Sequence, residues 1–331
     1  MKGEFGVELE LFTVLRGKNR QKWEQLLHTS GLASEEQPGQ TVLLWDDDIL
    51  AATGSRQGNL LKYLATDPRY QGQGLLSKVL TALRQEAFRE GHRHLFLYTK
   101  PQNGQLFLPL LFYPVISTDK VLLMEDRKDG IRSFLDSLPQ RETDSSAIVM
   151  NCDPFTLGHR HLIETAAADS KHLYVFVLSE DKSFFSYNDR LNMVKAGTAD
   201  LPNVTVLPTG PYLISAATFP TYFLSQRDSA KTVHCQLDIA IFTQYYAPKF
   251  RITRRYVGTE PLSAMTAEYN RALAEALPPH GIRLIQIPRK ETGGAPISAS
   301  AVRAALTQKD WDTVRSLVPK TTFDYLQEVS L

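Results

Sequence analysis

The stretch Asn151–Ala167, NCDPFTLGHRHLIETAA, decides how the second half of this 331-residue chain is interpreted. It follows the apolar run AIVM and leads into an alanine-rich helical pattern, so it predicts a strand, a loop and a helix over 157–168. The N–H groups and the positive dipole end of such a helix favour an anion. His159 falls in the first turn, where the dipole disfavours an imidazolium and favours a neutral ring that donates one hydrogen bond. We therefore expect an anion cradle at Thr156, Gly158 and His159.

The other reactive-looking residues of this stretch are expected to serve the fold. The sequence implies no base beside Cys152, so we interpret it as a small buried residue. His161 lies about 200° around the helix from His159, so the two rings are not expected to face one ligand. A plain helix cap at Gly158 and His159 is the alternative interpretation of the same pattern.

After residue 146 strands and helices alternate, which predicts an α/β fold with a parallel sheet and right-handed crossovers. The expected strands cover 147–151, 172–178, 204–208, 254–258 and 282–288, and the expected helices cover 157–168, 188–199 and 264–277. Ligands of such sheets bind beyond the carboxyl ends of the strands. Both the loop of the opening stretch and the later loop KETGGAPISAS lie at such ends.

A second polar cluster lies in ISASAVRAAL, residues 297–306. Ser298 and Ser300 precede a predicted helix, with Ser300 as its expected N-cap. Arg303, one turn further on, offers a fork of N–H donors to phosphate oxygens. By itself this pattern is that of an ordinary capped helix.

Together the two clusters resemble the nucleotidyltransferase superfamily. TLGH at Thr156–His159 matches its (H/T)xGH motif, and ISASAVR matches its ISxSxxR motif. SEDKSFFSYNDR, residues 179–190, resembles the family segment that brings a lysine to the phosphates. The resemblance implies ATP contacts from the following residues: Asn151, Thr156, Gly158, His159, Lys182, Arg190, Ser298, Ser300 and Arg303. For Lys182 a solvated loop position is the alternative, and for Arg190 a structural ion pair.

The first half predicts a strand meander over 41–45, 49–55 and 59–66, followed by a helix from residue 75 and a buried strand over 94–99. Between meander and helix, Arg69–Gly74 reads RYQGQG and matches RxxGxG, a turn whose amides can cradle a pyrophosphate. The arrangement resembles the GNAT acetyltransferase fold, which implies a coenzyme A-like ligand at Arg69, Gly72 and Gly74. Leu111 stands where a glycine is common, and a bare acyltransferase-like scaffold is the alternative.

The charged segment 125–146 supplies the linker, so we expect a GNAT-like α+β domain over 1–130, a linker over 131–145 and a nucleotidyltransferase domain over 146–331. This order resembles the citrate (pro-3S)-lyase ligase family over nearly the full chain. The resemblance implies that ATP, with Mg²⁺, activates acetate as acetyl-adenylate. The acetyl group then passes to the thiol of a coenzyme A-like prosthetic group on the citrate lyase acyl carrier subunit. His159, Lys182 and Arg303 are the implied catalytic residues.

Two other functions stay open at this point. One is an adenylyltransferase of cofactor biosynthesis, with phosphopantetheine or a mononucleotide as acceptor. The other is a non-catalytic nucleotide or coenzyme A sensor that uses both pockets for binding only.

The composition bears on possible partners, on location and on the roles of the cysteines. The 37 Lys and Arg against 36 Asp and Glu give a net charge of +1, so we expect no nucleic-acid partner. The sequence has no signal-peptide pattern and no run of 18 apolar residues, so we expect a cytoplasmic protein without a membrane partner. Cys152 and Cys235 give neither a disulfide framework nor a metal-ligand spacing.

Overall fold

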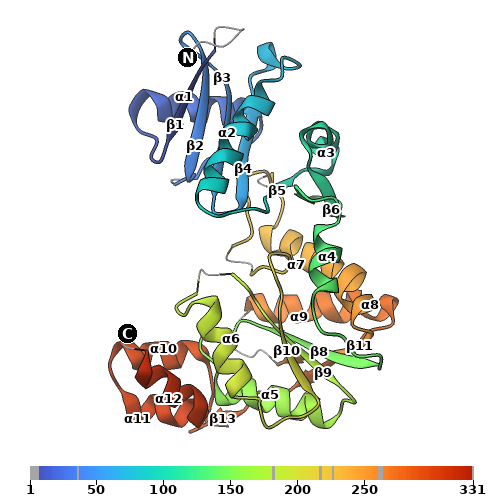
Figure 1. Ribbon diagram of the computed structural model, residues 1–331. Helices are drawn as coiled ribbons and strands as arrows, with labels where there is room; N and C mark the ends of the chain where they lie inside the picture. The colour runs from blue at the N-terminus through green and yellow to red at the C-terminus, as the bar shows by residue number, and fades with distance from the viewer. Residues whose placement is uncertain are drawn as a thin grey trace. The chain divides into compact units, whose positions relative to one another are not determined.

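The structure is a computed structural model that describes residues 7–35, 37–180, 183–215, 218–225, 227–259 and 264–329. It divides into two compact units, each described by itself below (Figure 1). The first unit comprises Met1–Gly130 and Pro220–Val233, and the second comprises Ile131–Phe219 and His234–Leu331. In the described part of the chain, no helix combines the length and the apolar character needed to cross a membrane.

The first unit is built on a seven-stranded sheet of order β1-β2-β3-β4-β5-β7-β6. Its strands are β1 (Glu8–Phe12), β2 (Gln40–Asp46), β3 (Ile49–Gln57), β4 (Leu60–Thr66), β5 (Phe96–Thr99), β6 (Tyr113–Ser117) and β7 (Leu122–Glu125). Its helices are α1 (Gly17–Thr29), η1 (Pro68–Tyr70), α2 (Leu75–Arg89), η2 (Pro101–Asn103), α3 (Gly104–Phe107) and η3 (Leu108–Leu110). All neighbouring strands are antiparallel except β4 and β5, which are parallel and pair only through their first two residues. The later parts of β4 and β5 therefore border an opening between them.

Helix α2 packs directly on β3 at Gly54. A Cβ at Gly54 would lie 2.7 Å from a methyl of Leu64 and 2.8 Å from a methyl of Val79. Val79 and Leu83 of α2 are fully buried in the same contact. Glycine is therefore what allows the helix to approach the sheet this closely. The contact holds the middle of α2 against the sheet, and the RYQGQG turn directly precedes this helix.

The segment 220–233 belongs to the first unit although it lies between strands of the second unit in the sequence. The carbonyl of Tyr222 accepts a hydrogen bond from the N–H of Ala33 at 2.8 Å. The Tyr222 hydroxyl donates to the carbonyl of Tyr98 at 3.0 Å, and its ring lies 4.6 Å from that of Tyr63. The division expected from the sequence does not contain this excursion.

The second unit has a five-stranded, fully parallel sheet of order β10-β9-β8-β11-β12. Its strands are β8 (Ser145–Met150), β9 (Leu173–Val177), β10 (Val204–Pro208), β11 (Ile252–Gly258) and β12 (Arg283–Ile287), with a separate hairpin of β13 (Glu291–Thr292) and β14 (Ala295–Pro296). Its helices are α4 (Gly130–Asp136), α5 (Leu157–Ala168), α6 (Tyr187–Ala196), α7 (Ala230–Ile241), η4 (Phe242–Tyr246), α8 (Ala247–Lys249), α9 (Ala264–Ala276), η5 (Pro278–His280), α10 (Ala299–Thr307), α11 (Trp311–Leu317) and α12 (Lys320–Glu328).

Helices cover both faces of this sheet. Buried side chains of α5, α6 and α10 to α12 form one core with β8 and β9. On the other face the ring of Phe176 lies 5.4 Å from that of Tyr246, and the ring of Tyr174 lies 4.9 Å from that of Phe250. The predicted α/β fold with a parallel sheet is confirmed. Because the chain order reverses between β8 and β11, the carboxyl ends of these two strands form a topological switch point, where such sheets bind ligands.

Candidate active site

Thr156 and His159 form a reciprocal cap at the start of α5. The N–H of His159 donates to Thr156 Oγ1 at 3.3 Å, and the N–H of Thr156 donates to His159 Nδ1 at 3.1 Å. Because a backbone N–H can only donate, Nδ1 must be the unprotonated nitrogen of the ring. The neutral imidazole therefore carries its proton on Nε2, as a donor with a fixed orientation.

His159 is neutral at physiological pH. Burial lowers the pKa of His159 to about 4, and the nearby Arg289 guanidinium lowers the pKa in the same direction. The neutral ring expected from the sequence is thus found, although burial is its main cause and the helix dipole was the expected one. A neutral donor can bind a phosphate oxygen without competing for a proton.

At Gly158 the two signature segments, TLGH (156–159) and ISASAVR (297–303), come into contact. A Cβ at Gly158 would lie 3.2 Å from the carbonyl oxygen of Ile297 and 3.5 Å from Thr156 Oγ1. Such a distance is tighter than an ordinary van der Waals contact, and its partner is backbone that has little freedom to move. Glycine therefore lets the ISASAVR segment lie against the first turn of α5.

The predicted N-cap of α10 was wrong by two residues. Ser298 has the extended backbone of an N-cap, with φ −129° and ψ 147°, and its Oγ accepts the N–H of Ala301 at 3.1 Å. Ser300 is the second helical residue and is exposed. Both serines satisfy the same sequence rule, and Ser298 takes the cap because Ala299 already has helical geometry. Ser300 Oγ accepts a hydrogen bond from Arg303 Nη2 at 3.2 Å instead.

A cavity of about 200 Å³ opens where the first turns of α5 and α10 meet the ends of β11 and β12. Residues of both signatures line it, together with residues from β11, α9 and the loop after β12: Thr156, Gly158, His159, His161, Tyr256, Gly258, Tyr269, Asn270, Arg289, Lys290, Ile297 and Ser298. His161 lines this cavity as well as His159. The expectation that the two rings do not face one ligand stays a prediction.

Arg289 and Lys290 are the cations that sequence reasoning missed. They follow β12, at the carboxyl end of a parallel strand, and both line the cavity. Arg289 Nε donates to the carbonyl of Thr259 at 2.9 Å. Two adjacent basic residues directly after a predicted strand were the available signal, since strand ends bind ligands in this architecture.

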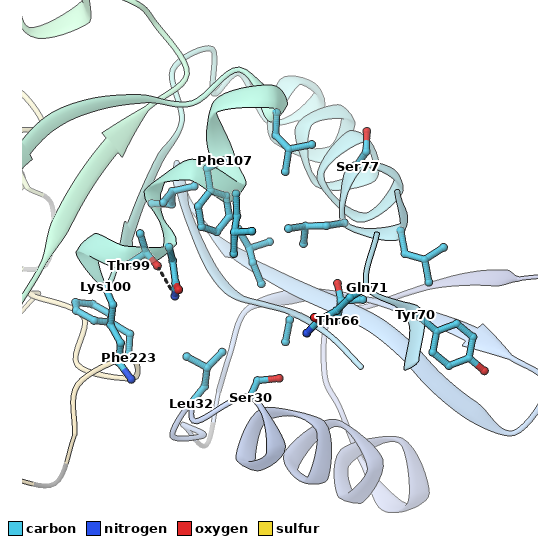
Figure 2. A pocket seen from close by; sticks show the side chains of 18 of the residues that line it. Ser30, Leu32, Thr66, Tyr70, Gln71, Ser77, Thr99, Lys100, Phe107 and Phe223 are labelled. Atoms are coloured by element: carbon cyan, nitrogen blue, oxygen red, sulfur yellow. Dashed lines mark hydrogen bonds between the residues drawn. The ribbon is translucent and has the colours of Figure 1, made fainter. Parts of the chain in front are cut away.

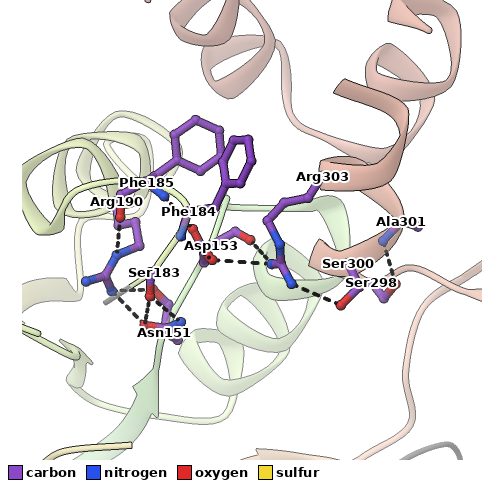
Figure 3. A network of polar contacts seen from close by, with 10 residues as sticks. All are labelled: Asn151, Asp153, Ser183, Phe184, Phe185, Arg190, Ser298, Ser300, Ala301 and Arg303. Atoms are coloured by element: carbon purple, nitrogen blue, oxygen red, sulfur yellow. Dashed lines mark hydrogen bonds and ion pairs between the residues drawn. The ribbon is translucent and has the colours of Figure 1, made fainter. Parts of the chain in front are cut away.

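Arg190 is a structural arginine inside the fold. Its side chain is 0% exposed, although it carries a charge. Its donors reach the following oxygens: the Asn151 carbonyl and Oδ1, and the carbonyls of Leu178, Glu180 and Phe185. Asn151 Nδ2 in turn donates to Ser183 Oγ at 3.0 Å (Figure 3). Arg190 and Asn151 thus hold the end of β8 against the 178–185 loop, and Lys182 of that loop lies outside the described residues.

Asp153 connects this network to α10. Its carboxylate accepts the N–H of Phe184 at 3.1 Å and the N–H of Phe185 at 2.9 Å. Arg303 donates to the Asp153 carbonyl, and its Nη1 lies 3.4 Å from the Asp153 carboxylate (Figure 3). Ser300, Arg303, Asn151 and Arg190 therefore belong to this polar network. They do not line the cavity that contains His159 and Ser298.

Two further residues of the opening stretch have internal roles. Thr156 is 1% exposed, and its hydroxyl is engaged with His159 in the helix cap. Cys152 is 1% exposed, and burial raises the pKa of its thiol, as expected of a packing residue. Neither group is poised to act as a nucleophile.

The first unit contains a larger cavity, of about 910 Å³, at the opening between β4 and β5. Gly72 and Gly74 line it from the RYQGQG turn, with positive φ angles of 79° and 74°. Figure 2 shows Gln71 of that turn on one side, and Thr99, Lys100 and Phe223 across the cavity. Arg69 does not line the cavity, and its guanidinium is paired with the Asp67 carboxylate at 2.7 Å.

The described residues contain no group of three or more His, Cys, Asp or Glu side chains that could hold a metal ion. In many proteins Mg²⁺ is held mainly by phosphate oxygens of the ligand and by water.

The chain matches known proteins over nearly its whole length. A family model described as the citrate lyase ligase C-terminal domain matches residues 145–326, and a model of the acetyltransferase (GNAT) family matches residues 9–106. A Klebsiella pneumoniae protein named citrate (pro-3S)-lyase ligase is 38% identical over 321 residues, which cover 94% of this chain and 93% of that protein. The chain belongs to the citrate lyase ligase family.

Two more members of the citrate lyase ligase family carry the same name. The protein of Escherichia coli strain K12 is 37% identical over 97% of this chain and 94% of its own length. The protein of Haemophilus influenzae is 36% identical over 92% of this chain and 94% of its own length. The chain is thus an enzyme of the ligase class, with an N-terminal domain that matches the GNAT family and a C-terminal citrate lyase ligase domain built on a parallel sheet.

Proposed function

We propose that this enzyme activates acetate with ATP and then acetylates the thiol of a coenzyme A-like prosthetic group on the citrate lyase acyl carrier subunit. The observation that carries the first step is the His159 Nε2–H donor, fixed in one tautomer beside the N-termini of α5 and α10. Two helix N-termini and two adjacent cations at one cavity form an environment suited to a polyphosphate. The name of the relatives, citrate (pro-3S)-lyase ligase, supports citrate lyase as the acceptor of the acetyl group.

The first step needs no general base. Acetate is already ionised at pH 7, so its oxygen attacks the α-phosphorus of ATP directly. The bond between the α-phosphorus and the bridging oxygen breaks, and diphosphate leaves with the electron pair. The barrier lies in aligning two anions and in stabilising the charge on the leaving group. The enzyme has to supply cations, N–H donors and orientation.

The residues divide into those that contact ATP and those that position them. His159, Ser298 and the first N–H groups of α10 are the proposed donors to phosphate oxygens, with Arg289 as a nearby cation. Ser300, Arg303 and Lys182 are the proposed ligands of the leaving diphosphate, which Mg²⁺ accompanies. Thr156, Asn151 and Arg190 act through others, because their polar atoms are engaged inside the fold.

The Asp153 carboxylate is not the site where acetate docks. It already accepts two N–H groups and faces Arg303, and a second carboxylate beside it would be repelled. The proposed docking group for acetate is one of the donors or cations, and Arg289, Lys290 and His161 at the cavity wall have the required chemistry.

In the second step the thiolate of the carrier's arm attacks the acetyl carbonyl of the adenylate. The carbon–oxygen bond to AMP breaks, AMP leaves, and the thiol proton passes to solvent. The cavity of the first unit is the proposed site of the arm, whose pyrophosphate would lie on the RYQGQG amides. An added Cβ at Gly72 or Gly74 meets nothing within 4 Å, so the space above the turn is open to a ligand.

ATP–pyrophosphate exchange tests the proposed function. Acetate should support exchange, whereas phosphopantetheine and mononucleotides should not. Exchange with phosphopantetheine or a mononucleotide would identify an adenylyltransferase, and absence of exchange with every acceptor would identify a sensor. His159→Ala and Lys182→Met should each lower acetate-dependent exchange by about 10²-fold or more, the usual effect of losing a preorganised donor.

Substitutions at Gly72 and Gly74 test whether the first unit binds the arm while the second unit activates acetate. Gly72→Val with Gly74→Val should leave exchange intact and lower acetyl transfer to the carrier, because side chains would block the approach of the pyrophosphate. Gly91→Val is the matched control, since Gly91 has φ 84° and equally open surroundings but does not line the cavity. An equal loss of exchange and transfer, or no change in either, would assign the arm to another site.

A further inference from the structure

The cavity of the first unit has a rim of exposed leucines. Leu106 and Leu110 line the cavity from α3 and η3, and Leu106 is 61% exposed. Leu111 follows directly and is 57% exposed. These three leucines are named the rim: Leu106 and Leu110 line the cavity, and Leu111 is the next residue in the chain.

Leu111 has a backbone conformation that leucine rarely adopts. Its φ of 60° and ψ of 41° place it in the left-handed region, where a Cβ is unfavourable. Its exposed side chain contributes little to the stability of the fold, because it is not part of the core. A strained residue that does not stabilise its own fold is a candidate for a function outside that fold.

The rim continues onto the outer face of α2. Arg84 Nη2 donates to the carbonyl of Leu110 at 2.7 Å, which joins the helix to the rim. Thr81, Arg84 and Phe88 follow one another at helical spacing and line a shallow groove of about 350 Å³. Phe88 is 59% exposed, and the Arg93 guanidinium lies 4.6 Å from its ring centre. The strip therefore combines apolar side chains with arginines, and the hydrogen bond of Arg84 joins it to Leu110 of the cavity wall.

We infer that this strip, made of Thr81, Arg84, Phe88, Arg93, Leu106 and Leu111, is the docking surface for the acyl carrier subunit. The inference rests on the proposed function, in which the prosthetic arm enters the cavity of the first unit. A protein attached to that arm has to contact the surface around the mouth, and this strip is continuous with it. Its chemistry calls for an acidic carrier face with an apolar centre, the complement of arginines around exposed leucine and phenylalanine side chains.

Leu111→Gly is the sharpest test, because glycine suits the left-handed backbone and removes only the exposed side chain. Phe88→Ser and Arg93→Glu probe the helix end of the strip. Val14→Ser is the control, because Val14 is equally exposed and lines neither the cavity nor the groove. We expect each strip variant to raise the KM for the arm-bearing carrier at least tenfold. The kcat and acetate-dependent pyrophosphate exchange should stay within twofold of wild type, and Leu111→Gly should not lower the melting temperature.

A carrier without its arm separates docking from arm binding. It should inhibit transfer competitively in the wild type, and the strip variants should raise its inhibition constant. No inhibition by the armless carrier, or a KM within twofold of wild type in all three variants, would overturn the docking surface. So would a wild-type protein that is dimeric in solution and becomes monomeric in Leu111→Gly at unchanged KM, since a second copy of the chain would then be the occupant. Absence of acetyl transfer by the wild type would instead reject the proposed function.

Discussion

Asp153 and Arg303 join segments of the second unit that lie 150 residues apart in the sequence. Arg303 donates to the carbonyl of Asp153 and approaches its carboxylate, which at the same time accepts the N–H groups of Phe184 and Phe185. One aspartate thus connects the end of β8, the loop that carries Lys182 and the helix of the second signature. The relative positions of the proposed phosphate ligands depend on it.

Asp153→Asn is expected to loosen this connection. An amide can accept only one of the two N–H groups and presents its own donors to the other and to Arg303, so the variant should lose about 2 kcal/mol of unfolding free energy. The KM for ATP in pyrophosphate exchange should rise about tenfold. Denaturant unfolding and exchange kinetics measure both effects. Asp144→Asn, at an exposed aspartate of the same unit, should change neither. Unchanged values in Asp153→Asn would show that the connection is not needed.

Arg190→Met separates a structural role from a phosphate-binding one. The substitution leaves several buried carbonyl oxygens without donors, so we expect a loss of about 3 kcal/mol or more in unfolding free energy. Arg271→Met, at an exposed arginine of α9, should cost less than about 0.5 kcal/mol. A stable Arg190→Met protein with a selectively raised KM for ATP would instead make Arg190 a phosphate ligand.

Gly158→Ala sets two effects against each other. Alanine favours the helix by roughly 0.5–1 kcal/mol, while its Cβ would press on the Ile297 carbonyl at 3.2 Å at a cost of about 1 kcal/mol or more. Stability should therefore change little. Exchange should fall at least tenfold, because the two signature segments have to move apart. An active variant with wild-type exchange would mean that the spacing of these segments is not critical.

His159 makes stability depend on pH in the acid range. Between pH 6.5 and 4 the unfolded chain binds a proton at this residue that the folded protein does not bind. The free energy of unfolding should therefore fall, between pH 7 and 4.5, by about 2 kcal/mol more in the wild type than in His159→Gln. Denaturant titrations at both pH values measure the difference. Equal pH dependence in the two proteins would mean that the folded ring is protonated at its usual pKa.

The alternating strands and helices of the second unit could be predicted because their apolar runs are long and regularly spaced. The expected helix over 157–168 is α5, and the expected strands correspond to β8 to β12. Helix α1 was not predicted, since its sequence GKNRQKWEQLLHT buries only Trp23, Leu26 and Leu27. Tertiary contacts with the sheet decide its structure, and no periodic pattern reveals them.

The candidate site was predictable where backbone chemistry defines it and less so where side chains converge from a distance. The cap at the start of α5 is local, and the sequence offered a helix cap there as the alternative to an anion cradle, although it placed the cap at Gly158 and His159 and the structure forms it from Thr156 and His159. Arg289 reaches the cavity from β12, a strand that is not adjacent to β8 in the sheet, so spacing along the chain gives no distance between the two. The sequence alone could not decide whether Arg190 binds a phosphate or holds the protein together. The structure favours the second role, because the guanidinium donates to carbonyl oxygens of the protein.

Residues 220–233 belong to the first unit, and this affects both the folding of the chain during synthesis and the design of shorter fragments. Tyr222 covers the Tyr98 carbonyl and packs on Tyr63, so the first unit is incomplete until the ribosome has passed residue 233. A fragment that ends at residue 130 would lack part of its cavity wall, which Tyr222 and Phe223 supply. The acetyltransferase-like half is therefore not an independent module that ends where the linker begins.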